Sequence, residues 1–462
     1  MPVVNIVYHR STVGTARVVL FVTCAAQFLV VLDGLIVTIA LPDMARDLGL
    51  SAAGQQWVLN GYLLTFGGLL LLAGRAGDVF GHRRVFLYGA AVSTVAVLVA
   101  GVAGAAWLLI AARFAQGVGA AALAPSTLSL LVTTFAEPER RRHAVAIWAA
   151  VSATAGVLGF VLGGAITALL GWRWVLLVNV PLGVVVLATA AVGLPVVRPV
   201  ERARLDVTGA VAVTGGAGAL ILGLAHAAEH GWGTARVLLA LSAAVILFGL
   251  AVVVEQRVPA PLLPLPVLGR RGVATGVAIM ALFGGVMNAT VYFLSLYHQQ
   301  VLGYGPLRTG AALLPMSAVI LVGSLASRTL LPRCGARLLV VAGSLVAAVA
   351  LVWMARLPES PGYVVHVLGP TMVWAAGVGV LTMPIVELVT GAVGPQLAGL
   401  GSGLVNMARH VGGAVGLAGL VTVVGTVADG GGSAVRGYNA ALLVAAGLAA
   451  GMAVLGLLTE DR

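Results

Sequence analysis

Three charged residues, Asp33, Arg113 and Arg409, lie inside long apolar segments of this 462-residue chain. A charge at the centre of a bilayer costs roughly 2.5–3.5 kcal/mol on insertion scales, so each of these residues needs a specific role. A buried carboxylate beside a guanidinium can take up and release a proton, because burial favours the neutral acid whereas the positive charge favours the carboxylate. The residue types therefore indicate proton coupling, and a static ion pair that fixes helix packing is the alternative.

Asp33 and Arg113 are predicted to lie at the same depth, measured from the same side. Asp33 lies about eight residues before the end of its apolar segment and Arg113 about seven residues into its own, so a rise of ~1.5 Å per residue places them about 12 Å and about 10 Å deep. Gln116, at i+3 from Arg113, is a polar neighbour, and Gly117, at i+4, leaves space beside it. We therefore expect Asp33 and Arg113 to face each other or to share water.

The segments that carry these residues are predicted to be transmembrane helices. Only 9% of the residues are charged and the mean hydropathy is +1.07, whereas about 25% of a soluble chain is charged. About 20 apolar residues cross the bilayer as a helix, and only helices or closed barrels satisfy the backbone in lipid. The apolar runs are long and do not alternate, which favours an all-α polytopic membrane protein. The fourteen predicted spans are 17–41, 55–74, 85–104, 106–133, 143–170, 174–195, 207–226, 235–254, 272–296, 307–330, 337–355, 363–384, 398–426 and 438–458.

The arginines predict the orientation of these spans. All 26 basic residues are arginine; 18 fall on one side of the predicted topology, six on the other, and two inside spans. Because cytoplasmic loops carry the excess of basic residues, both termini are predicted to be cytoplasmic.

The cytoplasmic turn between the second and third spans, "GRAGDVFGHRR" from Gly74 to Arg84, is unusually rich in charge and glycine. Glycines such as Gly81 permit a sharp turn, and the orientation rule accounts for Arg83 and Arg84. The rule does not account for Asp78, which can pair with the arginines or with the N-terminus of a neighbouring helix.

This turn resembles the G-x-x-x-D-R-x-G-R-R/K signature of the major facilitator superfamily, with Val79 in place of the usual arginine. "LDGLIVTIALP" (32–42), "RFAQGVGAAALAP" (113–125) and "GWRWVLLVNVPLG" (171–183) are similar to motifs of its fourteen-helix drug:proton antiporters. The chain is thus identified as a member of this branch.

A ridge of small residues in the fifth span resembles the end of the antiporter motif G-P-x-x-G-G, with Phe160 in place of proline. Its residues, which spacing predicts to allow close helix packing, are Ala155, Gly159, Gly163 and Gly164.

The resemblance implies a 6+2+6 arrangement: a six-helix half over 1–195, a linker with two extra helices over 196–271, and a second six-helix half over 272–462. It also implies alternating access to a cavity near the membrane midplane. The residues of the cytoplasmic turn would then form a gate that braces the two halves; they are Gly74, Asp78, Gly81, Arg83 and Arg84. Polar and aromatic residues inside the spans are candidates for the cavity wall, namely Gln27, Asn60, Tyr62, Gln116, Trp148, Asn288, Tyr292, Asn406 and Arg409.

These features favour a proton-coupled exporter of a small, largely hydrophobic compound in a bacterial plasma membrane, acting as a monomer without a cofactor. Its expected partners are the substrate, protons and lipid. Proton-coupled uptake of a metabolite by the same fold is the alternative. The net charge of +11 is scattered between apolar runs, which argues against a nucleic-acid partner, and no Walker A motif, metal-ligand cluster or enzyme-like loop is evident.

Overall fold

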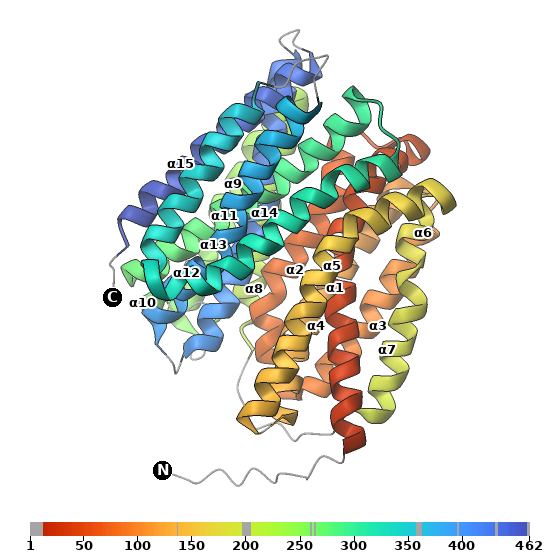
Figure 1. Cartoon of the computed structure of the whole chain (residues 1–462), viewed down its shortest axis with the longest axis vertical. Helices are drawn as coiled ribbons and strands as arrows, with labels where there is room; N and C mark the ends of the chain where they lie inside the picture. Colours follow the sequence, from red (N-terminus) through yellow and green to blue (C-terminus); the bar gives the residue numbers. More distant parts are fainter. Residues whose placement is uncertain are drawn as a thin grey trace.

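Long helices form the described part of the chain, and no strand occurs in it (Figure 1). The structure, a computed structural model, describes residues 13–135, 137–195, 205–258, 261–262, 265–356, 363–394, 397–429 and 433–459. Residues 1–12 and 196–204, parts of the predicted N-terminal half and linker, lie outside these ranges. The helices are α1 (Val13–Leu48), α2 (Ala52–Phe80), α3 (His82–Gly101), α4 (Ala106–Thr134), α5 (Pro138–Leu170), α6 (Trp172–Leu177), α7 (Asn179–Gly193), α8 (Val207–His230), α9 (Ala235–Arg257), α10 (Leu265–Leu268), α11 (Arg271–Leu296), η1 (Tyr297–Val301), α12 (Pro306–Met354), η2 (Val364–Leu368), α13 (Gly369–Val393), α14 (Ala398–Asp429) and α15 (Ala434–Leu457).

The helices match the predicted number of membrane crossings. Thirteen helical segments of the described residues are long and apolar enough to span a bilayer. The longest, α12, is two helices joined at a kink, where Gly335 has φ 75° and ψ 159°. The described residues therefore provide fourteen spans, as predicted, although most helices extend beyond the predicted boundaries.

The prediction that residues Gly74 to Arg84 form a loop is wrong. Helix α2 continues to Phe80 and α3 begins at His82, so Gly81 alone makes the turn, with φ 91° and ψ 131°. Helical backbone satisfies its own hydrogen bonds near the membrane, and arginine side chains are long enough to reach water from a helix end. Charge and glycine content were therefore a poor guide to loop length.

The helices pack into two bundles. Helices α1 to α7 contact one another in the first bundle, and α11 to α15 do so in the second. The two bundles meet through α5 with α12 and through α2 with α14, while α8 packs against α9, α2 and α14. We call the end where α1 passes into α2 the Asp47 end, and the end where α2 passes into α3 the Arg83 end. In Figure 1, α5 and α12 cross near the Asp47 end and diverge toward the Arg83 end.

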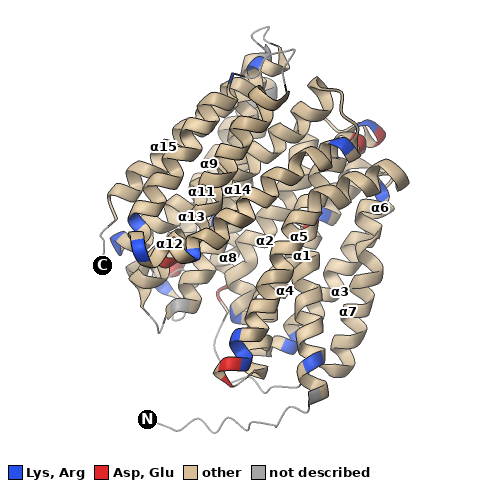
Figure 2. Ribbon diagram, in the orientation of Figure 1, with Lys and Arg blue, Asp and Glu red and all other residues tan. Residues whose placement is uncertain are grey.

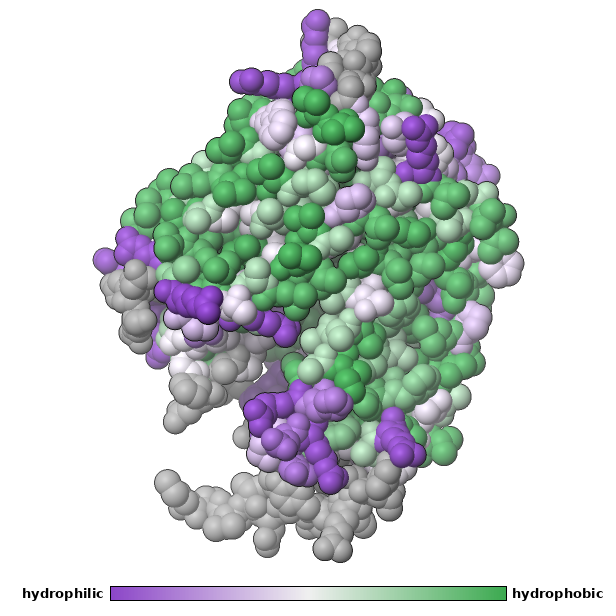
Figure 3. Space-filling view, in the orientation of Figure 1, coloured by the Kyte–Doolittle hydropathy of each residue, from purple (hydrophilic) through white to green (hydrophobic). Residues whose placement is uncertain are grey.

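The surface matches a protein that is surrounded by lipid. Large apolar side chains are exposed along the helices, for example Val192 at 91% and Val245 at 73%, and they form a broad apolar belt (Figure 3). Charged residues gather mainly at the helix ends (Figure 2). A soluble protein seldom exposes so large an apolar area, whereas a bilayer solvates it.

Candidate functional site

Asp33 of α1 and Arg113 of α4 form a direct ion pair, although 80 residues separate them in the chain. Arg113 Nη1 lies 2.6 Å from Asp33 Oδ2, and the two residues are 1% and 3% exposed. Of the two expected arrangements, direct contact or shared water, the structure shows direct contact. Because removal of either partner would leave a buried charge uncompensated, the pair is energetically sensitive to any change at either side chain.

Arg113 has further partners that hold its guanidinium in one orientation. Nη1 also donates to Gln116 Oε1 at 2.6 Å, and Nε donates to the carbonyl oxygen of Val58 in α2 at 3.0 Å. The guanidinium carbon lies 4.6 Å from the centre of the Tyr62 ring, in cation–π contact. A planar group with several fixed donors suits such a site better than a lysine ammonium would.

Small residues allow α2 and α4 to approach closely enough for these contacts. A Cβ atom at Gly117 would lie 2.0 Å from Thr65 Oγ1 and 2.5 Å from the carbonyl oxygen of Tyr62. Gly61 likewise faces the ring of Phe114, at 2.9 Å from its ideal Cβ position. The space that was expected beside Arg113, at Gly117, is therefore filled by the neighbouring helix.

A cavity of about 240 Å³, the central cavity, lies between the two bundles. Its walls come from α1, α2, α4 and α5 of the first bundle and from α11, α12 and α14 of the second, and they are predominantly apolar. Arg113 and Tyr62 form part of the wall, opposite Asn288 and Tyr292 of α11. An apolar cavity with a few polar groups is the usual form of a small-molecule site.

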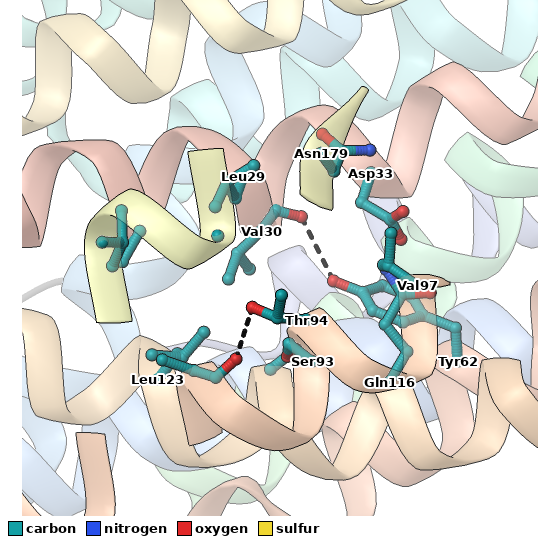
Figure 4. Close-up of a pocket in the computed structure, with 15 residues that line it drawn as sticks. Leu29, Val30, Asp33, Tyr62, Ser93, Thr94, Val97, Gln116, Leu123 and Asn179 are labelled. Carbon is teal, nitrogen blue, oxygen red and sulfur yellow. Dashed lines mark hydrogen bonds between the residues drawn. The ribbon is translucent and has the colours of Figure 1, made fainter. Parts of the chain in front are cut away.

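A second cavity, of about 40 Å³, lies inside the first bundle, and we call it the first-bundle cavity (Figure 4). Its walls come from α1, α2, α3, α4 and α7. Asp33 and Gln116 line this cavity and do not line the central cavity, whereas Arg113 lines the central cavity only. Tyr62 lines both, and its hydroxyl donates to the carbonyl oxygen of Val30 at 3.1 Å.

The predicted cavity residues divide into two groups. Tyr62, Asn288 and Tyr292 line the central cavity, and Gln116 lines the first-bundle cavity. The others lie outside both linings and remain predictions; they are Gln27, Asn60, Trp148, Asn406 and Arg409.

Two of these outlying residues each have one local polar partner. Asn406 donates to the carbonyl oxygen of Ser402 at 3.0 Å. Arg409 Nη2 lies 3.4 Å from His410 Nε2, and the His410 ring packs on Phe66 of α2 with ring centres 4.3 Å apart. Arg409 thus lies beside the interface between α2 and α14.

Sequence reasoning missed several small polar residues of the cavity walls. Thr38, Ser317 and Ser324 line the central cavity, and Ser93, Thr94 and Asn179 line the first-bundle cavity. Hydroxyl residues are inconspicuous in an apolar helix because they bond to their own backbone, as Thr94 does to Ala90 at 2.7 Å. Asn179, an amide in a strongly apolar span, was the one available signal.

The small-residue ridge of α5 packs against both bundles. Ideal Cβ positions at Gly159 and Gly163 would lie 2.9 Å from Leu35 Cβ and 2.8 Å from the carbonyl oxygen of Ile36, both in α1. Gly164 instead faces the carbonyl oxygen of Pro306 in α12, at 2.4 Å from its Cβ position. Ala155 is fully buried. The predicted close packing is thus present, and at Gly164 it joins the two bundles.

Further contacts between the bundles lie near the same Asp47 end. Gln299 donates to the carbonyl oxygen of Ile39 at 3.2 Å, and Ser295 donates to that of Thr38 at 3.4 Å. By contrast, the surface is hollowed between the bundles toward the Arg83 end (Figure 3). The structure is therefore closed at the Asp47 end and opens toward the other.

The predicted gate residues make local contacts in this structure. Asp78 lies 3.9 Å from Arg75 and 3.4 Å from His82, which belong to the same helix–turn–helix. Arg83 donates to the carbonyl oxygen of Ala191 in α7 at 2.6 Å. These contacts stay within the first bundle, which is compatible with a cavity that is open at this end. Gly74 lies within α2, and Arg84 at the start of α3 lines an apolar pocket on the outer surface of α2 to α4.

No metal site is found among the described residues, where no group of three or more His, Cys, Asp or Glu side chains could hold an ion.

Known proteins resemble this chain in sequence and in fold. The sequence model of the Major Facilitator Superfamily matches residues 23–417. The chain is 43% identical over 426 residues to a cephamycin export protein of Amycolatopsis lactamdurans, which covers 91% of this chain and 88% of that protein. It is 40% identical over 463 aligned positions to the puromycin resistance protein of Streptomyces alboniger, with coverage of 96% and 91%. A peptide transporter crystallised with sulfate superposes with a TM-score of 0.69 at 15% identity, covering 96% of this chain and 94% of that one; this likeness shows the fold alone.

Proposed function

The chain belongs to the Major Facilitator Superfamily, and from this premise we propose that it exports a small, largely hydrophobic compound across the cytoplasmic membrane in exchange for protons. Drug efflux fits its relatives, which are antibiotic export and resistance proteins. The many apolar helices and the bacterial relatives make it a multi-pass protein of a bacterial cell membrane.

The observation that carries the proposal is the buried Asp33–Arg113 pair, of which Arg113 lines the central cavity. The cavity is predominantly apolar with a few polar groups in its wall, as small-molecule sites are. Arg113 is the part of the pair that a bound compound can contact, and Asp33 is the part that can carry a proton. A compound that changes the Asp33–Arg113 distance therefore changes how readily Asp33 holds its proton.

Antiport follows when binding of the compound and protonation of Asp33 exclude each other. With Asp33 ionised, the carboxylate holds Arg113 in the orientation seen here. When Asp33 is protonated, the attraction between the two side chains falls, and Arg113 is free to move relative to the cavity. A cycle that binds the compound on one side and the proton on the other then exchanges them.

The motion in this cycle is assigned to the two bundles. Residues 1–195 and 272–462 would move as two bodies on either side of 196–271, with the gate residues Asp78, Gly81 and Arg83 bracing the Arg83 end when the cavity opens at the Asp47 end. The Arg83 end is taken as cytoplasmic because arginine is concentrated there. The transporter acts as a monomer. It needs no cofactor, because the proton gradient drives the exchange.

Inverted membrane vesicles test this function. The chain and Asp33→Asn are expressed in a bacterium that lacks its own pumps, a pH gradient is imposed, and a pH dye reports proton release as lipophilic compounds and antibiotics are added. We expect at least one compound to collapse the gradient with the native chain and not with Asp33→Asn.

A matched variant separates coupling from the general effect of removing an acid. Asp43→Asn removes a carboxylate that pairs with Arg46 at the exposed Asp47 end, so it should behave as the native chain does. Full proton-driven transport by Asp33→Asn would contradict the role of Asp33. Accumulation of a compound in whole cells, driven by the proton gradient, would reverse the proposed direction.

A further inference from the structure

The first-bundle cavity and the central cavity each reach a different member of the ion pair. Asp33 faces the first-bundle cavity and Arg113 faces the central cavity, with Tyr62 between them. A compound in the central cavity can therefore contact the guanidinium without touching the carboxylate. The proton needs a different approach to Asp33.

One oxygen of Asp33 has no partner among the described residues. Oδ2 accepts from Arg113, whereas Oδ1 is buried and accepts no hydrogen bond. A buried carboxylate oxygen left without a donor costs free energy, and the first-bundle cavity is the space beside this side chain (Figure 4). Oδ1 therefore requires a donor that comes from this cavity.

The cavity has the size to hold water, and polar side chains lie along its mostly apolar wall. A buried water needs roughly 10–15 Å³ of such volume and two to four polar partners, so a cavity of about 40 Å³ accommodates about three waters. Polar side chains from three other helices line it, namely Ser93 and Thr94 of α3, Gln116 of α4 and Asn179 of α7. Gly183 of α7 makes room for the Thr94 hydroxyl, which would lie 2.5 Å from a Cβ atom there.

The cavity extends from Asp33 toward the Arg83 end. Its wall on α1 runs from Asp33 back to Ala26, a distance of about 10 Å at ~1.5 Å per residue. In Figure 4 Asp33, Gln116 and Tyr62 lie at one end of the cavity and Leu123 lies at the other. Its axis therefore follows the first bundle, beside the central cavity and separate from it.

We propose that the first-bundle cavity is a binding site for a short chain of waters that conducts the proton from Asp33 toward the Arg83 end, while the exported compound reaches the ion pair only through the central cavity. The proposal rests on the proposed proton-coupled function. In the release step, the O–H bond on Oδ1 of the neutral acid breaks and its electron pair stays on the carboxylate. The nearest water takes up the proton and passes another along the chain, and the ionised Asp33 pairs again with Arg113.

Radiolytic hydroxyl-radical labelling of the intact protein, read by mass spectrometry, tests the hydration directly, because radicals formed from bound water oxidise the side chains next to it. Leu123 and Val186 line the first-bundle cavity and are 3% and 1% exposed. Leu131 and Val175 are fully buried and line neither cavity. We expect oxidation of the first two well above the second two; equal oxidation overturns the proposal. The labelling needs no substrate, so its result is independent of whether any compound is transported.

A matched pair of Thr→Val variants tests the separation of the two routes. Thr94 lines only the first-bundle cavity and Thr38 only the central cavity. Thr94→Val should slow compound-induced proton release by roughly 3- to 10-fold, the range that one lost hydrogen bond produces, and leave the Kd of the compound unchanged. Thr38→Val should change the Kd and leave the rate of proton release from the bound complex unchanged. Proton release that is insensitive to Thr94→Val, or slowed equally by both variants, overturns the proposal.

Discussion

Gly164 in α5 lies directly against the backbone of Pro306 in α12: a Cβ atom at Gly164 would be 2.4 Å from that carbonyl oxygen and 3.1 Å from Leu307 Cα. Backbone cannot yield as a flexible side chain can. The two bundles are therefore closed at the Asp47 end by a contact that only glycine permits.

Gly164→Val should prevent this closure and favour conformations that open at the Asp47 end. In a background without cysteines, Val291→Cys places a thiol in the wall of the central cavity. We expect a membrane-impermeant maleimide, added to the Asp47 side, to label this thiol faster in Gly164→Val. Gly447→Val is the control, since nothing lies within 4 Å of a Cβ atom there. Unchanged labelling would show that the contact does not hold the end closed.

Gly156→Leu should fill the central cavity without disturbing the fold. Gly156 lines the cavity, and no atom lies within 4 Å of its ideal Cβ position. The added side chain would compete with the substrate for the same volume, so we expect transport to be lost while Tm stays near that of the native chain. Gly249→Leu in α9, where the Cβ position is equally open, should leave transport intact. Transport at the native rate by Gly156→Leu would show that the substrate binds outside this part of the central cavity.

Arg113→Lys and Arg113→Gln should separate charge from geometry. Lysine keeps the charge but cannot hold Asp33, Gln116 and the Val58 carbonyl together, so we expect exchange to fall by roughly tenfold or more, at about 0.5–1.5 kcal/mol per lost bond. Glutamine also removes the charge that favours the carboxylate. We therefore expect compound-driven proton release in inverted vesicles to fall further in Arg113→Gln than in Arg113→Lys. Equal rates for the two variants would show that charge at this position is unimportant.

Gly68→Ala should loosen the attachment of α8 to α2. Its Cβ atom would lie 2.3 Å from Thr214 Oγ1 and 2.9 Å from Thr214 Cβ, and overpacking of this kind costs about 1–3 kcal/mol. We expect a lower Tm in the native background and no loss in a Thr214→Gly background. Thermal unfolding of the four proteins in this cycle measures the coupling. The same loss of Tm in both backgrounds would remove Thr214 as the cause.

Gly81→Ala should strain the turn between α2 and α3. The backbone there has φ 91° and ψ 131°, a conformation that L-residues avoid at about 1–3 kcal/mol. We expect reduced stability together with reduced transport, measured by Tm and by efflux. Gly391→Ala, in a helix and with open space at the Cβ position, serves as the control and should be neutral or slightly stabilising. If Gly81→Ala matches the control, the turn tolerates another backbone geometry.

Much of the fold was predictable because the bilayer acts on each segment separately. An apolar run long enough to cross lipid must do so as a helix, and this holds without knowledge of its neighbours. The predicted ends of the helices were less accurate than their number. Helices extend past the hydrocarbon layer at their polar ends, and for that reason the expected loop from Gly74 to Arg84 proved to be a single turn at Gly81.

The cavity walls could not be predicted in the same way. Asn288 and Asn406 are both amides within apolar spans, yet Asn288 lines the central cavity and Asn406 does not. Whether a side chain points into a cavity depends on the rotation of its helix about its own axis. Packing against other helices sets that rotation, and the local sequence does not record it.

The pattern of apolar segments predicted the fourteen crossings, and the sidedness and the similar depth of Asp33 and Arg113 were expected from it, because hydrophobicity, arginine bias and a constant rise per residue are properties of single segments. The contacts between helices were needed to show that the two side chains touch, that Asp33 faces one cavity and Arg113 the other, and that glycines bring the bundles together at the Asp47 end. These relationships arise between helices distant in the chain, where close packing selects one arrangement from many with the same pattern.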